Sequence, residues 1–254
     1  MSLFKEDDIV PEIQEERLFA LCGQYLDVKK TSKKLIWRKY LAAEKDIARR
    51  LRVFFEPTEV LPPSITQAYK DSLDAASKPW IDDPGEDWDP QMFSGRKWGW
   101  FSVRHRPITN ILSIKFIYPG VDNELFDVPP SWFRPDKKYG TIQLVPDQDS
   151  IEAPLSAFWM RVVGGGRVIP HMLHLHYEAG ISDITNDYPD ILDLVKRATV
   201  LRLLDDAFLA QTSSISADGI SESVSIDLDK YRDAMDKSIK ELKEEIHGIP
   251  SMVV

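Results

Sequence analysis

The order of local patterns along the chain restricts its architecture more than any other sequence feature. Helical periodicity occupies both ends, and a stretch with the composition of β-strands lies between them. Neither helical end alone buries enough apolar surface. We therefore expect an α+β protein in which N- and C-terminal helices form one helical bundle, with a small antiparallel β-domain inserted into it. The alternative is two independent helical ends.

Changes in composition give the expected boundaries. They predict an N-terminal helical part of the bundle over 1–78, an acidic linker over 79–97, the inserted antiparallel β-domain over 98–180, and C-terminal helices with a serine-rich loop and a tail over 181–254. Short runs of β-branched and aromatic residues predict strands over 100–103, 111–118, 125–128, 141–145, 158–163 and 168–177.

Apolar residues at helical spacing predict the helices 11–26, 31–55, 64–76, 187–210 and 228–247. Pro57 is expected to stop the second of these, and Asp187 to cap the fourth. In the fourth helix, Arg202 and Asp206 are four residues apart and predict an ion pair within the helix, as do Asp193 and Arg197.

The helix expected over 31–55 carries the strongest local charge. Ten Lys or Arg residues and only two acids lie between Lys29 and Arg52. Four of the cations share the face opposite Ile36: Arg38, Lys45, Arg49 and Arg52. Such a face either contacts phosphates, or is a solvated face or a face paired with acidic segments of a neighbour. The net charge of -9 excludes a uniformly basic nucleic-acid coat.

One histidine-rich strand offers the best candidate chemistry. Alternation places His174, His176 and Glu178 on one face of the strand 168–177 and its continuation, with His171 on the other face. Two histidines and a carboxylate could hold a metal ion, which gives the hypothesis of a metal-dependent enzyme. The alternative is a half-buried strand with a polar outer side, and the spacing favours it.

The sequence motifs of other common catalytic sites are incomplete. The chain has neither a complete phosphate-binding loop nor a nucleophile elbow, and its single cysteine, Cys22, excludes an intramolecular disulfide. We expect no catalytic residue, cofactor or metal. The acidic N-terminus has no secretory pattern, and no apolar stretch reaches the roughly 20 residues of a membrane span. These features predict a protein made in a reducing cytoplasm.

The segment Tyr188–Ala198 resembles the helical core of tailed-bacteriophage head-tail adaptor proteins, also called connector or head-completion proteins. In that family a helix opened by proline and aspartate follows the rest of the bundle. The stretch Arg106–Ile114 is similar to a strand of such proteins, and Ala217–Ser223 to the loop after their core helix. The resemblance covers 183–247 best and 32–55 second. Compact members are nearly all helical, so 95–180 departs from the simplest pattern.

This resemblance implies a structural virion protein. Such a protein forms a ring, usually of twelve copies, in the neck between the capsid portal and the tail. The implied partners are the portal protein, a downstream neck or tail protein, other copies of the chain, and double-stranded DNA that passes without sequence-specific binding; no membrane is involved. A stopper or tail-terminator is another possible neck component, but the flanking helices argue against it.

A DNA channel also constrains the charge. If each of twelve subunits offered one free cation to DNA, the logarithm of the DNA-binding constant would fall against the logarithm of salt concentration with a slope near -10, at roughly -0.9 per contact. Such a ring would hold DNA tightly instead of letting it pass. We therefore expect Arg38, Lys45, Arg49 and Arg52 to form an inter-subunit charge face, neutralised by acids of the same or an adjacent subunit, such as those of 71–89.

The C-terminal helix and apolar tail are the expected portal contact, because they have no evident core of their own. Burial inside the same subunit is the alternative. The predicted contact residues are Tyr231, Ile239, Ile246, Ile249, Met252, Val253 and Val254.

Overall fold

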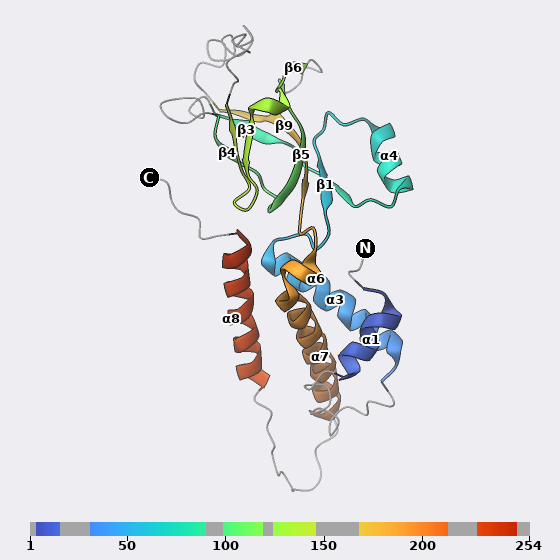
Figure 1. Ribbon diagram of the computed structural model, residues 1–254. Coiled ribbons are helices and arrows are strands. Elements are labelled where there is room, and N and C mark those ends of the chain that lie inside the picture. The colour runs from blue at the N-terminus through green and yellow to red at the C-terminus, as the bar shows by residue number, and fades with distance from the viewer. Residues whose placement is uncertain are drawn as a thin grey trace, which may run out of the picture. The chain divides into compact units, whose positions relative to one another are not determined.

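The computed structural model describes residues 4–15, 31–89, 99–118, 124–145, 168–212 and 228–247. The chain combines helices and β-sheets, so the predicted α+β class is confirmed. It divides into two compact units (Figure 1). The helical unit comprises 1–52 and 183–245, and the β unit comprises 53–182 and 246–254.

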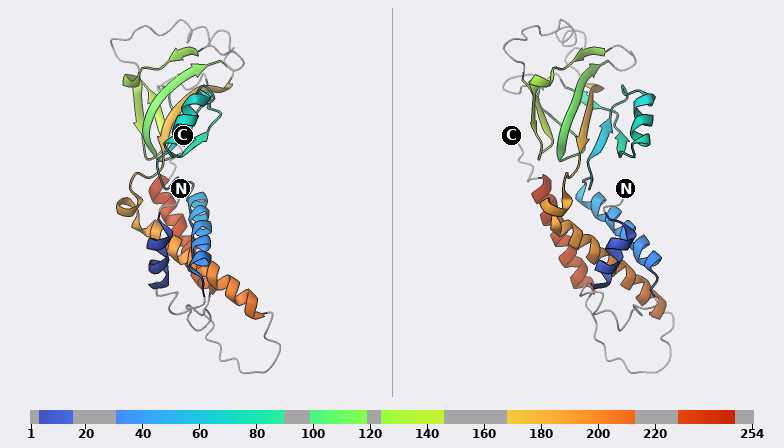
Figure 2. Two further views of the ribbon diagram at one scale, coloured as in Figure 1. Left: turned by 90° about the vertical axis from the view of Figure 1, so that its right-hand side faces the viewer. Right: turned by 45° about the vertical axis from the view of Figure 1, so that its right-hand side comes forward.

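The helical unit is built from both ends of the chain. Its helices are α1 (Glu6–Glu15), α3 (Lys33–Leu51), α6 (Ile184–Asp187), α7 (Pro189–Thr212) and most of α8 (Leu228–His247). α7 packs along α3, and α1 contacts both (Figure 2). The apolar faces that meet are fully or nearly fully buried: Ile36, Tyr40, Ile47 and Leu51 from α3, and Ile191, Leu194, Leu201 and Leu204 from α7.

α3 begins where the sequence predicts and ends earlier. The Ser32 hydroxyl accepts a hydrogen bond from the Leu35 backbone N–H at 3.2 Å, which caps the first turn. Arg52 then adopts the left-handed conformation, with φ of 59°, and its N–H bonds the carbonyls of Ala48 and Arg49. The helix is closed before Pro57 can act, so the predicted end at Phe55 is wrong.

Two other helix starts also differ from expectation. α1 begins at Glu6 with an acidic first turn, which suits the positive end of the helix dipole, and Pro11 lies inside it. The predicted extension over 16–26 lies outside the described residues. The cap predicted at Asp187 is wrong, because Asp187 is the last residue of α6, whose own cap is Asp183, accepting from Asn186 N–H at 3.1 Å. α7 starts at Pro189, as a proline suits a first helical turn.

The α3–α7 contact is crossed by ion pairs. Lys39 Nζ lies 2.5 Å from Asp206 Oδ2, and Arg202 Nη2 lies 3.1 Å from Asp46 Oδ2. The predicted pair between Arg202 and Asp206 within α7 is therefore wrong, since each residue pairs with α3 instead. Helical spacing made the two residues neighbours, but partners on the facing helix compete for the same charges.

The β unit contains two sheets. The larger has the order β2-β1-β9-β5-β6, with β3 also paired to β9, and the smaller has the order β4-β8-β7. Their strands are β1 (Thr58–Leu61), β2 (Trp80–Asp82), β3 (Glu86–Trp88), β4 (Phe101–Ser102), β5 (Ile108–Ile117), β6 (Glu124–Asp127), β7 (Phe133–Asp136), β8 (Thr141–Leu144) and β9 (Ile169–Ala179). A 3-10 turn (Pro130–Trp132) precedes β7, and α4 (Gln67–Ala75) connects β1 to β2. Among the described strands, β1 and β2 pair in parallel and every other pairing is antiparallel.

The expected division of the chain needs correction at the start of the β unit. The acidic linker predicted over 79–97 contributes β2 and β3 to the larger sheet, as far as it is described. Residues 53–78, assigned to the helical bundle, supply β1 and α4 to the β unit. The acidic composition concealed strands whose apolar residues are packed, such as Trp88 at 5% exposure. The strand predicted over 158–163 lies outside the described residues.

β9 is the organising strand of the β unit. It pairs with β1, β3 and β5 and contributes Leu173, Leu175 and Tyr177 to the core. Its alternate residues, including the three predicted metal ligands, face the opposite side of the sheet. The polar side chains of the β unit that could form a site therefore lie on or next to β9.

Candidate functional site

A buried carboxylate on β1 gathers polar side chains from three elements. Glu59 is 2% exposed, and its Oε2 lies 2.9 Å from His176 Nε2 on β9 and accepts from the Tyr69 hydroxyl of α4 at 3.1 Å. Lys78 donates to Glu59 Oε1 and, at 2.7 Å, to Glu178 Oε1. We call Glu59, Tyr69, Lys78, His176 and Glu178 the Glu59 cluster.

Hydrogen bonds decide the electrostatics of the Glu59 cluster. Burial acts to raise the pKa of Glu59, but donation from Lys78, His176 and Tyr69 outweighs it, so the pKa is lowered. Hydrogen bonds to Glu178 and Glu59 raise the pKa of Lys78, and burial together with the bond to Glu59 raises the pKa of Tyr69. The cluster thus holds an ionised glutamate against an ionised lysine.

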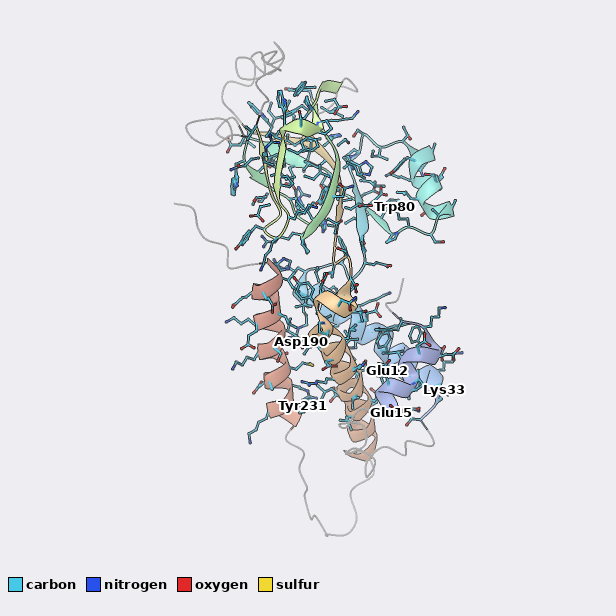
Figure 3. The ribbon with its side chains drawn as sticks, viewed as in Figure 1. Glu12, Glu15, Lys33, Trp80, Asp190 and Tyr231 are labelled. Carbon is cyan, nitrogen blue, oxygen red and sulfur yellow. The ribbon has the colours of Figure 1, made fainter. Side chains whose placement is uncertain are left out.

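The Glu59 cluster fixes α4 and the turn after it onto the sheet. Tyr69 comes from α4 and Lys78 from the turn, and further polar contacts lie beside them. Trp80 of β2 donates to Asp74 at 2.8 Å, and Lys70 pairs with Asp82 at 2.5 Å (Figure 3 labels Trp80). Both Glu59 oxygens are engaged in these internal contacts. The arrangement serves structure.

The predicted metal ligands are on one face of β9 but do not form one site. His176 contacts Glu59 and Glu178 contacts Lys78. His174 is buried, its Nδ1 has no hydrogen-bond partner among the described residues, and burial lowers its pKa, which favours the neutral ring. No group of three or more His, Cys, Asp or Glu side chains in the described parts of the chain is arranged to hold a metal ion.

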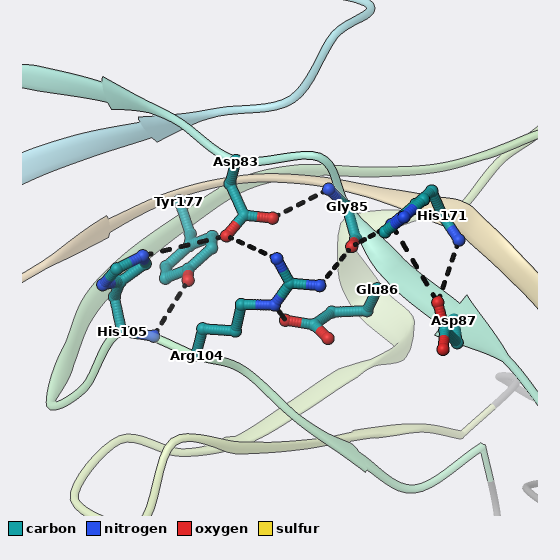
Figure 4. A network of polar contacts seen from close by, with 8 residues as sticks. All are labelled: Asp83, Gly85, Glu86, Asp87, Arg104, His105, His171 and Tyr177. Carbon is teal, nitrogen blue, oxygen red and sulfur yellow. Dashed lines mark hydrogen bonds and ion pairs between the residues drawn. The ribbon is translucent and has the colours of Figure 1, made fainter.

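A second polar network lies where the turn before β3 meets the loop after β4 (Figure 4). Arg104 is its centre: Nη2 donates to the Gly85 carbonyl at 3.1 Å, Nη1 lies 3.9 Å from Asp83, and Nε lies 3.6 Å from Glu86. His105 Nε2 lies 3.8 Å from the same Asp83 carboxylate. We call Asp83, Gly85, Glu86, Arg104 and His105 the Arg104 network.

Burial dominates the titration of the Arg104 network. It lowers the pKa of His105, which the Asp83 charge opposes, and raises the pKa of Glu86 against the attraction of Arg104. Tyr177, whose hydroxyl accepts from the His105 backbone N–H at 3.3 Å, also has a raised pKa because it is buried. These groups are held in place by internal contacts.

The backbone at Gly85 explains how the Arg104 network closes on β9. Gly85 has a φ of 91°, and a Cβ atom there would lie 2.7 Å from the Leu173 carbonyl oxygen. Only glycine allows this approach. The next segment is also tied to β9, because Asp87 Oδ1 accepts from the His171 backbone N–H at 3.0 Å. His171 itself has a positive φ of 54°.

The predicted charge face on α3 is exposed. Arg38, Lys45 and Arg49 are exposed on α3, Arg52 is exposed at its C-terminal cap, and Arg49 contacts Asp46 of the same helix at 3.5 Å. Within the described ranges, the other three form no ion pair. We call these four residues the α3 basic row.

Acids of 71–89 do not neutralise the α3 basic row in the way expected. Asp82 pairs with Lys70, while Asp83 and Glu86 contact Arg104. These acids belong to the β unit and are engaged there. Neutralisation by an adjacent subunit stays a prediction.

Two of the predicted portal contacts are buried in the chain, which is the alternative expected for the C-terminal helix. Ile239 is 4% exposed and Ile246 is 1% exposed. Tyr231, at the start of α8, is half-buried (Figure 3). The remaining predicted contacts, Ile249, Met252, Val253 and Val254, lie outside the described residues.

Sequence reasoning missed the centres of both polar clusters. Glu59 gave one weak signal, a carboxylate inside the short β-branched run Thr58–Leu61. Lys78 gave none, because its partner Glu178 is 100 residues away. Arg104 and Asp83 were likewise separated by the predicted linker.

Comparison with known proteins finds no match: no family model, no curated protein and no solved structure is similar to the chain. No helix in the described parts of the protein has the length and apolar character of a membrane span.

Proposed function

We propose that the protein is a structural subunit of a tailed-bacteriophage neck, a head-tail adaptor that assembles into a ring around the DNA channel. In this proposal, helices from both chain ends form the bundle and the β unit is inserted between them. The observation that carries the proposal is the contrast between internal and exposed charge. The two polar clusters of the β unit are engaged in internal contacts, whereas the α3 basic row is displayed on the surface.

The helical unit supports this assignment in a second way. Most of the segment that resembles the adaptor core helix, Tyr188–Ala198, forms the start of α7, which begins at Pro189. α7 contributes many buried residues and packs along α3. A helix buried in this way is suited to be the central helix of a bundle. The second-best part of the resemblance, 32–55, covers α3.

The proposed partners are the portal protein, a downstream neck or tail protein, and other copies of the chain, in a ring that we take to contain twelve. Double-stranded DNA passes through this ring without sequence-specific binding. The proposed location is the virion neck. Tyr231 and the apolar residues of 249–254 remain the proposed portal contact.

Deletion of 249–254 tests the portal contact. The variant should fold normally by circular dichroism and thermal unfolding, but it should lose binding to purified portal in a pull-down assay. A matched variant with Ile249, Met252, Val253 and Val254 replaced by Ser keeps the chain length and should give the same loss. Retained portal binding by both variants would remove this contact from the proposal.

Imaging of the particle tests the assignment as a whole. A tag on the N-terminus, visualised by electron microscopy of purified virions, should appear at the neck between capsid and tail. A label found elsewhere on the virion, or absent from it, would contradict the proposed function.

A further inference from the structure

We infer that the α3 basic row of one copy of the chain binds an acidic face on α1 of a second copy. The acidic face is defined by Asp8 and Glu15, both exposed on α1. They lie opposite the buried Ile9 and Ile13, so they point away from the core of their own helical unit. Neither carboxylate forms an ion pair with any described residue of the chain.

The spacing of the two faces matches. Asp8 and Glu15 are seven residues apart within α1, as are Arg38 and Lys45 within α3. Seven residues of an α-helix rise about 10.5 Å and return to nearly the same face. An α1 helix laid along α3 can therefore bring its two carboxylates to two consecutive cations of the row at once. Glu12 lies between them and pairs with Lys196 of α7 at 2.7 Å (Figure 3).

The matched spacing favours a second copy over DNA as the partner. Duplex DNA presents a phosphate about every 3.4 Å along each strand and accepts cations at almost any spacing, so a match in spacing is required only by a partner helix. The chain itself supplies carboxylates at the spacing of the cations. Every copy carries one acidic face and one α3 basic row, so the two faces are present in equal number.

The geometry of such a contact suits a ring. The two faces lie on different helices, so in a head-to-tail arrangement each copy offers the basic row to one neighbour and the acidic face to another. A head-to-tail contact of this kind produces a closed ring when its rotation closes. The inference rests on the part of the proposed function that has the chain assembling with itself, and does not depend on the portal.

Charge reversal tests the contact. Variant B carries Arg38→Glu and Lys45→Glu, and variant A carries Asp8→Lys and Glu15→Lys. In either variant alone both faces have the same sign, so self-association should weaken at least about tenfold, because like charges brought together across an interface are costly. In an equimolar mixture every A–B contact is again complementary, so association should return to that of the natural chain. Sedimentation velocity of the full chain over a range of concentration and salt measures all four samples.

A matched control separates the specific contact from net charge. Lys138→Glu with Lys240→Glu changes the charge as much as variant B, and both positions are exposed outside the α3 basic row. This control should associate like the natural chain. Circular dichroism of each variant establishes that the fold is retained.

The outcomes are distinct. Rescue in the A–B mixture establishes the contact. The inference is overturned if variant A or B alone self-associates as strongly as the natural chain, or if the mixture shows no rescue. The adaptor proposal is then still judged separately by virion imaging. A natural chain that stays monomeric at every concentration also overturns it. Tight, salt-sensitive binding of duplex DNA that variant B loses, with assembly unchanged, would assign the row to DNA instead.

Discussion

The β unit and the helical unit use charged residues in different ways. In the β unit, buried carboxylates such as Glu59 and Asp83 draw cations from distant segments into internal clusters. In the helical unit, ion pairs such as Lys39–Asp206 cross one helix contact, while the α3 basic row stays on the surface. Charges engaged in internal contacts stabilise the fold, whereas the exposed charges of the α3 basic row are available to a partner. Substitution of a buried, paired charge should lower the free energy of unfolding, whereas substitution in the α3 basic row should leave it nearly unchanged and weaken self-association.

The largest effect is expected from Lys78→Met in the β unit. The substitution keeps the aliphatic stem and removes the cation that Glu59 and Glu178 share. Removing one partner of a buried pair typically costs about 3–5 kcal/mol, and because Lys78 is 39% exposed we expect a smaller loss of about 2–3 kcal/mol in the free energy of unfolding. Urea denaturation followed by circular dichroism measures it.

Lys138→Met is the control for that prediction. Lys138 is exposed in the same unit, so the free energy of unfolding should change by no more than about 0.5 kcal/mol. The double variant Lys78→Met with Glu59→Gln should recover part of the loss, since the uncompensated carboxylate is gone. Equal losses in Lys78→Met and the control would mean that the Glu59 cluster does not stabilise the β unit.

These internal clusters also show how far the sequence predicts the structure. Periodicity located α4 over 67–75, most of α3 and strands such as β5 and β9, because each pattern depends on local burial. It misread 79–89 as a linker, because the pairing of Asp83 and Glu86 with Arg104 is a tertiary contact that local composition does not encode. From sequence alone, a carboxylate beside a β-branched run is predicted to be exposed to solvent, because the cation that pairs with it is distant in the chain.

The same limit applies to the candidate site. Alternation correctly placed His174, His176 and Glu178 on one face of β9, but it could not show that Glu59 and Lys78 occupy two of them. The left-handed cap at Arg52 was also hidden, because this conformation at a helix end is usually adopted by glycine or asparagine and an arginine gives no such signal. The exposure of the α3 basic row did follow from spacing, since one helix face is a local property.

A smaller effect is expected from Glu59→Gln, and its pH dependence reveals the cause. The pKa of Glu59 is lowered in the folded protein, so its charge contributes stability above the unfolded pKa of about 4.3 and loses that contribution as pH falls through the folded pKa. The variant should be about 1–2 kcal/mol less stable than the natural chain at pH 7, and the gap should narrow below about pH 4. Urea denaturation across this pH range measures the gap.

Glu86→Gln provides a contrast within the same unit. Burial raises the pKa of Glu86, so protonation favours the folded state and the natural chain should gain stability relative to this variant as pH falls. The two variants should therefore show pH dependences of opposite sign. Parallel pH curves for the two would show that neither carboxylate is perturbed by its surroundings.

The smallest effect on stability is expected in the helical unit, from Arg38→Ala with Arg52→Ala. Both side chains are exposed and form no ion pair within the described chain, so the free energy of unfolding should change by less than about 0.5 kcal/mol. The helix propensity of alanine acts slightly in favour of the variant at Arg38. Thermal and urea unfolding should thus be nearly unchanged, whereas self-association should weaken. A large loss of stability would place these cations among the internal charges, and it would remove the distinction between the two units on which the inter-copy contact depends.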